Sequence, residues 1–434
     1  MFVPGIMGSA LVLPTGKQVW PPEPHEVVLG YKRKEELQRA DLRVNDIVRN
    51  VSCFDVYEPL IETFANVGFQ EKGGGDRLVL FPYDWRRDLE GLSDQLAAKL
   101  AEVAAGASSI TIVAHSMGGL IARLALERGK FDASGWLKKT DIFMSLATPH
   151  LGAPLALARI LGLDSAMGIS AEDFREIAGN RDYPSGYQLL PAPGEVACWN
   201  IKEGQRLEEI DIYDPVAGGR IGLDPQLTAR AAWVHQTLAN GKQPAHIRYF
   251  YFAGTGHKTA TRVNVATKEM VVTRSEDAGD GTVPLWSALP VSAQKQLVVG
   301  EHASFFTDTN FKAVFYRLFG KPFPKPPIGA AGAPGTAALS VQALTIRATD
   351  EIELMIAPAA PVDKVACEVV LERTDRPGGD FAPFGAPVSV SYLGPPIPLL
   401  KLRLKPVGTP GFYRISLHGS SVSAMPAQFA ATGP

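Results

Sequence analysis

The sequence predicts an α/β protein with a mostly parallel sheet, followed by a small β-rich domain. Over residues 50–150, short apolar runs such as ITIVA (110–114) and DIFMSLA (141–147) alternate with amphipathic stretches of helical spacing. Short continuous apolar strands between helices are typical of a parallel sheet that is covered on both faces. After residue 337 the pattern changes to short β-type segments separated by turn residues, which is typical of a β-sandwich.

The length of the chain, 434 residues, exceeds what one hydrophobic core usually serves, so more than one domain is expected. We expect an α/β domain at 1–320, a Pro/Gly-rich linker at 321–337 and a β-sandwich domain at 338–434. Residues 151–245 interrupt the alternation of strands and helices. They are therefore expected to form a cap insertion above the sheet.

Composition excludes several classes of partner and site. A net charge of −2 gives no indication of nucleic acid as a partner. The three cysteines lie far apart without metal-ligand or redox spacing, so we expect buried thiols rather than disulfides at Cys53, Cys198 and Cys367. No apolar run approaches the ~20 residues that a transmembrane helix needs.

Localisation is left open by the start of the sequence. The chain as given has no signal peptide, which indicates the cytoplasm. However, it begins with MFVPGIMGS, which reads as the end of a core strand and a functional loop. A truncated N-terminus and a lost targeting segment therefore remain the alternative.

The sharpest local feature is the sequence AHSMG at 114–118, between an apolar strand and an apolar helix. This pattern is typical of a nucleophile elbow, in which a serine on a tight strand-to-helix turn exposes its hydroxyl above the sheet. The turn requires small residues two places before and after the serine, and Ala114 and Gly118 meet this need. We therefore predict Ser116 as a nucleophile rather than a plain turn serine.

A serine nucleophile needs a base, and in α/β-hydrolases the chain order is serine, acid, histidine. His302 directly follows the apolar run QLVVG (296–300), where a base can reach over the end of a strand. His150 is the main competitor, but it precedes every plausible acid. His302 is therefore the predicted base.

The acid that orients the base is expected in the loop SEDAGDGTVP, between the last two core strands. Asp277 and Asp280 both lie in this loop, and Asp280 is favoured because it is flanked by two glycines that permit a sharp turn. An oxyanion hole is also required. One backbone N–H is expected from Met117, and the other from the Gly-containing turn VPGIMGS at 3–9.

Together these motifs resemble the lecithin:cholesterol acyltransferase family and its bacterial lipase-like relatives. The matching stretches occur in the family's order over residues 1–318: VPGIMGS (3–9), FPYDWRRD (81–88), AHSMGG (114–119), ATPHLGAP (147–154), AGTG (253–256), GDGTVP (279–284) and His302. The resemblance implies an α/β-hydrolase fold with Ser116 as nucleophile, Asp280 as acid and His302 as base. It also implies that Met7 and Met117 supply the oxyanion amides.

The resemblance implies roles for two further segments. Asp84 and Arg86 of the PYDWR motif would support the active site, whereas the residues alone indicate a surface ion pair of little value. Residues 11–50 would form a lid that contacts membranes, with Trp20 either an interfacial anchor or a buried side chain. Animal members staple this lid with a disulfide, but the region offers only Cys53, which implies a mobile lid.

The predicted function is that of a serine-dependent lipid acyl-ester hydrolase or O-acyltransferase, of the phospholipase A or lipase type. It needs no cofactor or metal, and its partners would be a lipid or other acyl ester and, peripherally, a membrane. Two alternatives remain: a soluble small-ester hydrolase, and a non-catalytic hydrolase-fold protein that works through its β-sandwich.

Overall fold

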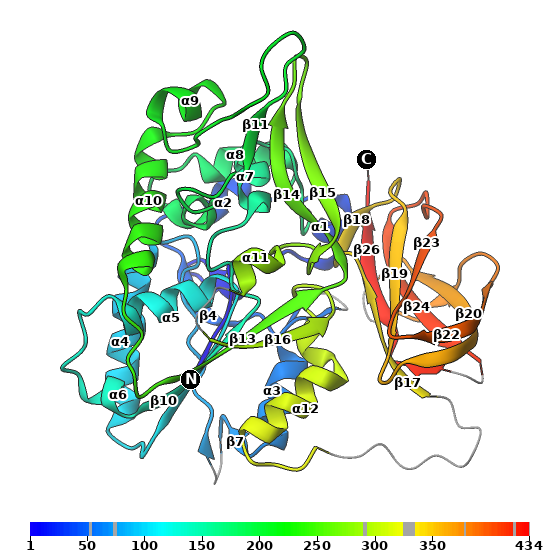
Figure 1. Ribbon diagram of the computed structural model, residues 1–434, viewed down its shortest axis with the longest axis horizontal. Coiled ribbons are helices and arrows are strands. Elements are labelled where there is room, and N and C mark those ends of the chain that lie inside the picture. The colour runs from blue at the N-terminus through cyan, green and yellow to red at the C-terminus, as the bar shows by residue number, and fades with distance from the viewer. Residues whose placement is uncertain are drawn as a thin grey trace.

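The computed structural model describes the chain except residues 52–53, 73–75, 290–292, 324–334, 377–378, 420–421 and 434. At its centre is a five-stranded sheet in which all neighbouring strands are parallel (Figure 1). Its order is β1 (Phe2–Val3), β9 (Ile110–His115), β10 (Thr140–Leu146), β13 (Arg248–Thr255) and β16 (Gln294–Val299). The predicted α/β class with a parallel sheet is thus confirmed.

Helices cover both faces of this sheet. One face packs against α4 (Leu89–Ala104) and α5 (Met117–Glu127), and the other against α3 (Glu58–Asn66) and α12 (Thr309–Leu318). Successive strand residues point to opposite faces, so in β9 Ile112 joins the first apolar cluster and Val113 the second. Burial on both sides explains why β9 and β10 carry apolar residues toward both faces rather than on alternate positions only.

A second layer lies above the carboxyl ends of the strands. Residues 9–50, which include the expected lid at 11–50, contain a small sheet of order β3 (Gln18–Trp20), β2 (Ser9–Val12) and β4 (Arg43–Ile47), together with two short helices, α1 (Pro24–Leu29) and α2 (Lys34–Leu37). The cap contains α7 (Pro154–Ile160), α8 (Ala171–Ala178), η1 (Pro184–Leu189), α9 (Pro215–Arg220) and α10 (Pro225–Asn240). Shorter elements are β5 (Asn50–Val51), β6 (Phe54–Asp55), β7 (Phe69–Gln70), β8 (Asp76–Arg77), α6 (Gly135–Lys138), α11 (Leu285–Ala288) and η2 (Phe305–Thr307).

The cap also includes strands that lie outside the predicted range 151–245. Its sheet has the order β12 (Glu208–Glu209), β11 (Cys198–Asn200), β14 (His257–Val265) and β15 (Met270–Gly279). The long β14–β15 hairpin therefore comes after core strand β13 and rises above the sheet (Figure 1). Apolar residues of β14 such as Val263 share a buried cluster with the cap helices, which holds the hairpin there.

The C-terminal part consists of two sheets. One has the order β23 (Leu400–Leu404), β19 (Ile352–Pro358), β17 (Gly335–Val341) and β25 (Val422–Ala424). The other has the order β18 (Thr345–Arg347), β26 (Ala427–Thr432), β24 (Gly411–His418), β20 (Val362–Thr374) and β21 (Ala382–Pro383), and β22 (Val388–Ile397) also pairs with β20. Residues from both sheets, including Leu354 and Phe429, form a common apolar cluster. Most of the expected linker, residues 324–334, lies outside the described residues.

The cysteines and the search for a transmembrane helix can be compared with the expectations from the sequence. Cys198 and Cys367 are free and buried, as expected, while Cys53 lies outside the described residues. In the described part of the chain, no helix combines the length and the apolar character that crossing a bilayer requires.

Candidate active site

Ser116 lies on the sharp turn between β9 and α5. Its φ of +52° is in the left-handed region, which costs a non-glycine residue about 1–3 kcal/mol. The turn is also tightly packed, because a Cβ on Gly118 would lie 2.3 Å from the Pro4 carbonyl oxygen. A Cβ on Gly119 would lie 1.9 Å from the Thr148 hydroxyl oxygen. The small residues after the serine are therefore a steric requirement of the elbow.

The structure brings Ser116, His302 and Asp280 into one hydrogen-bonded row. The His302 Nε2 lies 3.0 Å from Ser116 Oγ, and its Nδ1 lies 2.8 Å from Asp280 Oδ2. A carboxylate only accepts hydrogen bonds, so Nδ1 carries the proton and Nε2 is left to accept from the serine hydroxyl. The second carboxylate oxygen of Asp280 accepts from the backbone N–H groups of Thr282 and Val283, at 2.9 and 2.7 Å.

The two competing residues lie elsewhere. The side chain of Asp277 is 62% exposed and forms an ion pair with Lys401, so it does not face the imidazole. His150 is buried, its Nε2 lies 2.9 Å from Ser145 Oγ and its ring stacks on Tyr251. Neither of them lies in the row that the structure forms around Ser116.

Electrostatics favour a protonatable imidazole beside Ser116. Burial by itself lowers the pKa of His302, but the charge and the hydrogen bond of Asp280 outweigh it, so the pKa is raised above its usual value.

The neighbouring Glu301 was not singled out from the sequence. Burial raises the pKa of this carboxyl to about 7, and its side chain lines the same cavity as His302. Its only sequence signal is its position next to the predicted base.

The candidate oxyanion groups lie on either side of the serine. Met117 is the first residue of α5, so its N–H has no acceptor within the helix. Met7 has a φ of +62° in the turn after β1 and lines the cavity. Its carbonyl oxygen accepts a hydrogen bond from Trp20 Nε1 at 2.6 Å, which fixes the orientation of this strained turn.

Trp20 is therefore not an interfacial anchor in this structure. Its side chain is 1% exposed, and its ring packs edge-on against Trp85 and Tyr31 at centroid distances of 5.6 and 5.9 Å. The indole N–H is satisfied by the Met7 carbonyl oxygen of the turn at residues 4–9, which we call the oxyanion turn after the candidate role of Met7, so burial costs no hydrogen bond. Of the two sequence-based alternatives for Trp20, the buried one is correct.

The PYDWR segment supports the same turn from the other side. The Tyr83 hydroxyl donates to the Pro4 carbonyl oxygen at 2.7 Å, and Trp85 Nε1 donates to the Ser9 carbonyl oxygen at 3.2 Å. Arg86 is 1% exposed and pairs with Asp84 at 2.8 Å, so the surface ion pair suggested by the residues alone is wrong. Arg86 also donates to two backbone carbonyl oxygens of residues 37–39 and thereby ties this segment to the region above the sheet.

A second hydrogen-bonded row was not foreseen from the sequence. The Gly5 N–H donates to the Tyr57 hydroxyl, and this hydroxyl lies 2.8 Å from His115 Nδ1. Since the Tyr57 oxygen accepts from Gly5, its own proton points to Nδ1, and His115 Nε2 then donates to the His302 carbonyl oxygen at 3.0 Å. Tyr57 and His115 thus connect the oxyanion turn to the loop of the candidate base.

The candidate triad opens into a cavity of about 290 Å³. Ser116 and His302 line it together with mostly apolar side chains from the oxyanion turn, residues 11–50 and the cap. Residues 343–345 of the C-terminal part complete the lining. Among the described residues, no group of three His, Cys, Asp or Glu side chains is arranged to hold a metal ion.

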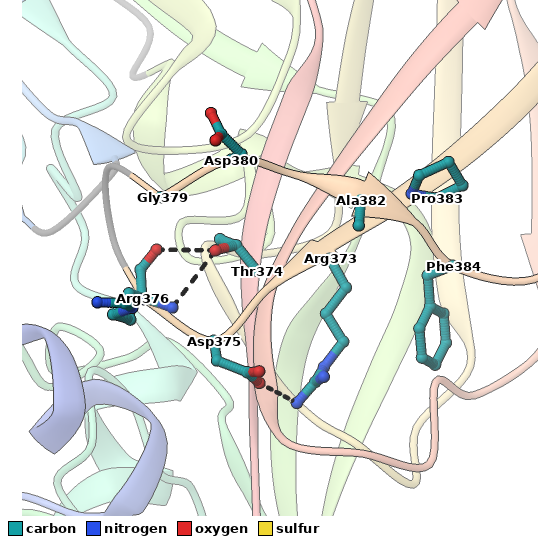
Figure 2. Close-up of a pocket in the computed structure, with 9 residues that line it drawn as sticks. All are labelled: Arg373, Thr374, Asp375, Arg376, Gly379, Asp380, Ala382, Pro383 and Phe384. Atoms are coloured by element: carbon teal, nitrogen blue, oxygen red, sulfur yellow. Dashed lines mark hydrogen bonds and ion pairs between the residues drawn. The ribbon is translucent and has the colours of Figure 1, made fainter.

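A separate hollow of about 700 Å³ lies on the C-terminal part, beside β20 and β21 (Figure 2). Its lining is polar: Arg373 pairs with Asp375 at 2.5 Å, and the Thr374 hydroxyl donates to the Arg376 carbonyl oxygen at 3.0 Å. Residues 377–378, which follow Arg376 in the sequence, lie outside the described residues. None of the residues that line this hollow belongs to the candidate triad.

Comparisons with known proteins identify a family and a curated relative. A model of the lecithin:cholesterol acyltransferase family matches residues 33–210. A curated relative, lecithin-cholesterol acyltransferase-like 4 of Arabidopsis thaliana, is 25% identical over 322 residues, or 60% of this chain. The chain spans 58% of the length of that relative.

Solved structures are similar at lower sequence identity. The crystal structure of the Tle4–Tli4 complex contains a chain that is 14% identical, with a TM-score of 0.52, over 74% of this chain and 97% of that one. The mature form of the Bacillus licheniformis lipase BlEst2 is 15% identical, with a TM-score of 0.34, over 55% and 78% of the two chains. At 14% identity, the similarity to the chain of the Tle4–Tli4 complex shows a common fold and carries no information on activity.

Proposed function

Because the chain belongs to the lecithin:cholesterol acyltransferase family, we propose that it is a serine-dependent enzyme that cleaves lipid acyl esters through an acyl-serine intermediate. The observation that carries this proposal is the contact of 3.0 Å between Ser116 Oγ and His302 Nε2, with Asp280 on the far side of the imidazole. The apolar cavity above this contact supports a substrate with a hydrocarbon chain.

In the proposed mechanism, Ser116 Oγ attacks the ester carbonyl carbon while His302 Nε2 takes the hydroxyl proton. The backbone N–H groups of Met7 and Met117 stabilise the negative oxygen of the tetrahedral intermediate. As the intermediate collapses, His302 returns the proton to the leaving alcohol and the acyl group stays on Ser116. Water or an alcohol then attacks the acyl-serine, His302 takes its proton, and that proton finally goes back to Ser116.

Supporting roles follow from the contacts of the oxyanion turn. Asp84 and Arg86 act indirectly, because their buried pair fixes the segment whose Tyr83 and Trp85 hold the turn.

The proposal includes the domain layout of an α/β-hydrolase at 1–320 and a β-sandwich at 338–434. Phospholipase A, triglyceride lipase and O-acyltransferase reactions all use this machinery and differ only in the acyl donor and acceptor.

Release of fatty acid from phosphatidylcholine vesicles tests the proposal. We expect the parent protein to release fatty acid and Ser116→Ala to lose several orders of magnitude in turnover, because the nucleophile is gone. Ser109→Ala, which changes an exposed serine, is the matched control and should retain full activity. Added alcohols then distinguish a transferase, which forms new esters, from a lipase, which does not.

Other outcomes would contradict the proposal. Equal activity of the parent and Ser116→Ala would exclude the acyl-serine mechanism. Preference for short soluble esters, with no gain in activity at vesicles, would indicate a small-ester hydrolase instead. Inactivity of the parent on every ester would indicate a protein that uses the fold for binding.

A further inference from the structure

The C-terminal part contributes directly to the wall of the candidate active-site cavity. Ala343 and Leu344, between β17 and β18, and Thr345, the first residue of β18, line the same cavity as Ser116 and His302. These residues lie more than two hundred positions after the nucleophile and beyond the expected linker. We call residues 342–345 the wall turn.

Close contacts fix the wall turn against the α/β part. The Met167 N–H of the cap donates to the Thr345 hydroxyl at 3.2 Å. On the other side, a Cβ added to Gly281 would lie 2.8 Å from the Gln342 carbonyl oxygen. Gly281 directly follows the candidate acid Asp280, so the wall turn packs against the loop that presents the acid. The Leu344 carbonyl oxygen accepts from Ala430 N–H of β26 at 2.8 Å, which holds the turn to its own sheet.

Neighbouring contacts extend this interface beyond the wall turn. Ion pairs join β23 to the β14–β15 hairpin, between Lys401 and Asp277 and between Arg403 and Glu276. His257 Nε2 lies 3.2 Å from Ser340 Oγ of β17, two residues before the wall turn. Figure 1 shows the C-terminal strands beside this hairpin. The position of the wall turn is therefore defined by contacts on several sides rather than by its own strands alone.

The chemistry of the wall turn indicates which part of a substrate it meets. Ala343 and Leu344 offer only apolar side chains, and the Thr345 hydroxyl is already engaged by Met167. Polar groups of the cavity, such as Arg159 and Glu301, come from other segments. An apolar wall excludes a charged headgroup because its desolvation would not be compensated, whereas hydrocarbon gains from burial.

Resting on the proposed function, we propose that the wall turn limits the length of the acyl chain that the cavity accepts, with Leu344 as the determining side chain. The cavity of about 290 Å³ lies at the low end of the ~300–1,000 Å³ of small-molecule sites, so one large side chain changes its capacity substantially. The C-terminal part is then a component of the substrate site and not an independent binding module.

The test compares Leu344→Trp, which fills the cavity, with Leu344→Ala, which enlarges it. We expect Leu344→Trp to lower kcat/KM for long-chain nitrophenyl esters at least about tenfold more than for nitrophenyl acetate. Hydrocarbon pockets discriminate between substrates that differ by one methylene by about 10–200-fold. Leu344→Ala should move the preferred chain length upward. Leu393→Ala is the matched control, since Leu393 belongs to the same C-terminal part and is 83% exposed.

A second readout separates this inference from the proposed function. Nitrophenyl alkylphosphonates of increasing chain length label an activated serine, whose oxygen attacks phosphorus and displaces nitrophenolate, and intact-mass spectrometry measures the rate for each variant without turnover. Failure of the parent to be labelled at Ser116 would overturn the proposed function. Labelling of all variants with the same chain-length dependence would overturn the role of Leu344 and leave the proposed function intact. If Leu344→Trp does not fold, an unchanged preference in Leu344→Ala is sufficient to reject the inference.

Discussion

Asp280 is held in place by more than its contact with the imidazole. Its Oδ1 accepts two backbone N–H groups from the loop that follows, and its own carbonyl oxygen accepts the His302 N–H at 3.0 Å. The side chain is therefore oriented before any substrate binds, which is the condition for stabilising an imidazolium during the reaction. Asp277, three residues earlier, has none of these restraints on its side chain and faces Lys401.

From this difference we expect opposite results for two identical substitutions. Asp280→Asn should lower kcat about 10⁴-fold, because the amide favours the wrong imidazole tautomer. It should also move the acidic limb of the pH–activity profile downward, since Asp280 raises the pKa of His302 and activity requires the neutral imidazole. Asp277→Asn should change neither quantity. Steady-state kinetics across pH measures both, and a large loss in Asp277→Asn would reverse the assignment of the acid.

Glu301 makes stability depend on pH. Burial raises the pKa of its carboxyl from 4.5 to about 7, so between these values the folded state holds a proton that the unfolded state has released. The free energy of unfolding therefore falls as pH rises through this interval, by roughly 2–4 kcal/mol for this group.

Glu301→Gln should remove that contribution, because the amide has no proton to lose. Urea denaturation at pH 5 and pH 8 measures it, and the variant should lose less stability on raising the pH than the parent does. Glu62→Gln, which changes an exposed carboxyl, should follow the parent. An identical pH dependence in Glu301→Gln and the parent would show that the buried carboxyl titrates normally.

At the scale of elements, local patterns were sufficient for the central sheet and the elbow. The strand β9, the turn at Ser116 and the helix α5 are consecutive in sequence, so periodicity and residue size describe them completely. His302 follows the central strand β16, and Asp280 lies between β13 and β16, where the order serine, acid, histidine places the acid, although the strand it follows, β15, belongs to the cap hairpin. This explains why the three side chains could be placed from sequence order.

Other elements depend on contacts that no local pattern contains. The β14–β15 hairpin has strand-like residues, but only the cap cluster around Val263 shows why it leaves the central sheet. The sequence does not decide whether Trp20 is exposed or buried, because its partner is a backbone atom, the carbonyl oxygen of Met7 in a strained turn. The link from Tyr57 through His115 to His302 likewise joins three distant segments.

At the scale of the whole molecule, the sequence predicted a separate β domain but not where it docks. One buried apolar cluster contains Val28 of α1 together with Phe412 and Ala430 of the C-terminal sheet. The Gly433 N–H also donates to the Val28 carbonyl oxygen at 3.5 Å. Residues 11–50, which have no disulfide among the described residues, are therefore packed between the α/β part and the C-terminal strands.

A shared core makes a prediction about unfolding. Multidomain chains commonly unfold in separate steps, but parts that share buried apolar side chains should lose their structure together. We expect calorimetry to give a single transition for the parent protein. Phe412→Ala should destabilise the chain by about 3–5 kcal/mol and lower the midpoint of that one transition. Esterase activity should disappear over the same temperature range, because residues 11–50 hold the oxyanion turn through Trp20.

The control for this coupling is Leu393→Ala, which removes an exposed leucine of the C-terminal part and should leave the midpoint unchanged. Two transitions, of which Phe412→Ala moves only one, would show that the C-terminal part unfolds independently. If esterase activity then survived the lower transition, the wall turn would not be needed for a working site. If activity were lost at that transition, the C-terminal part would be required for activity although its core unfolds separately. The reason would be that its docking closes the cavity.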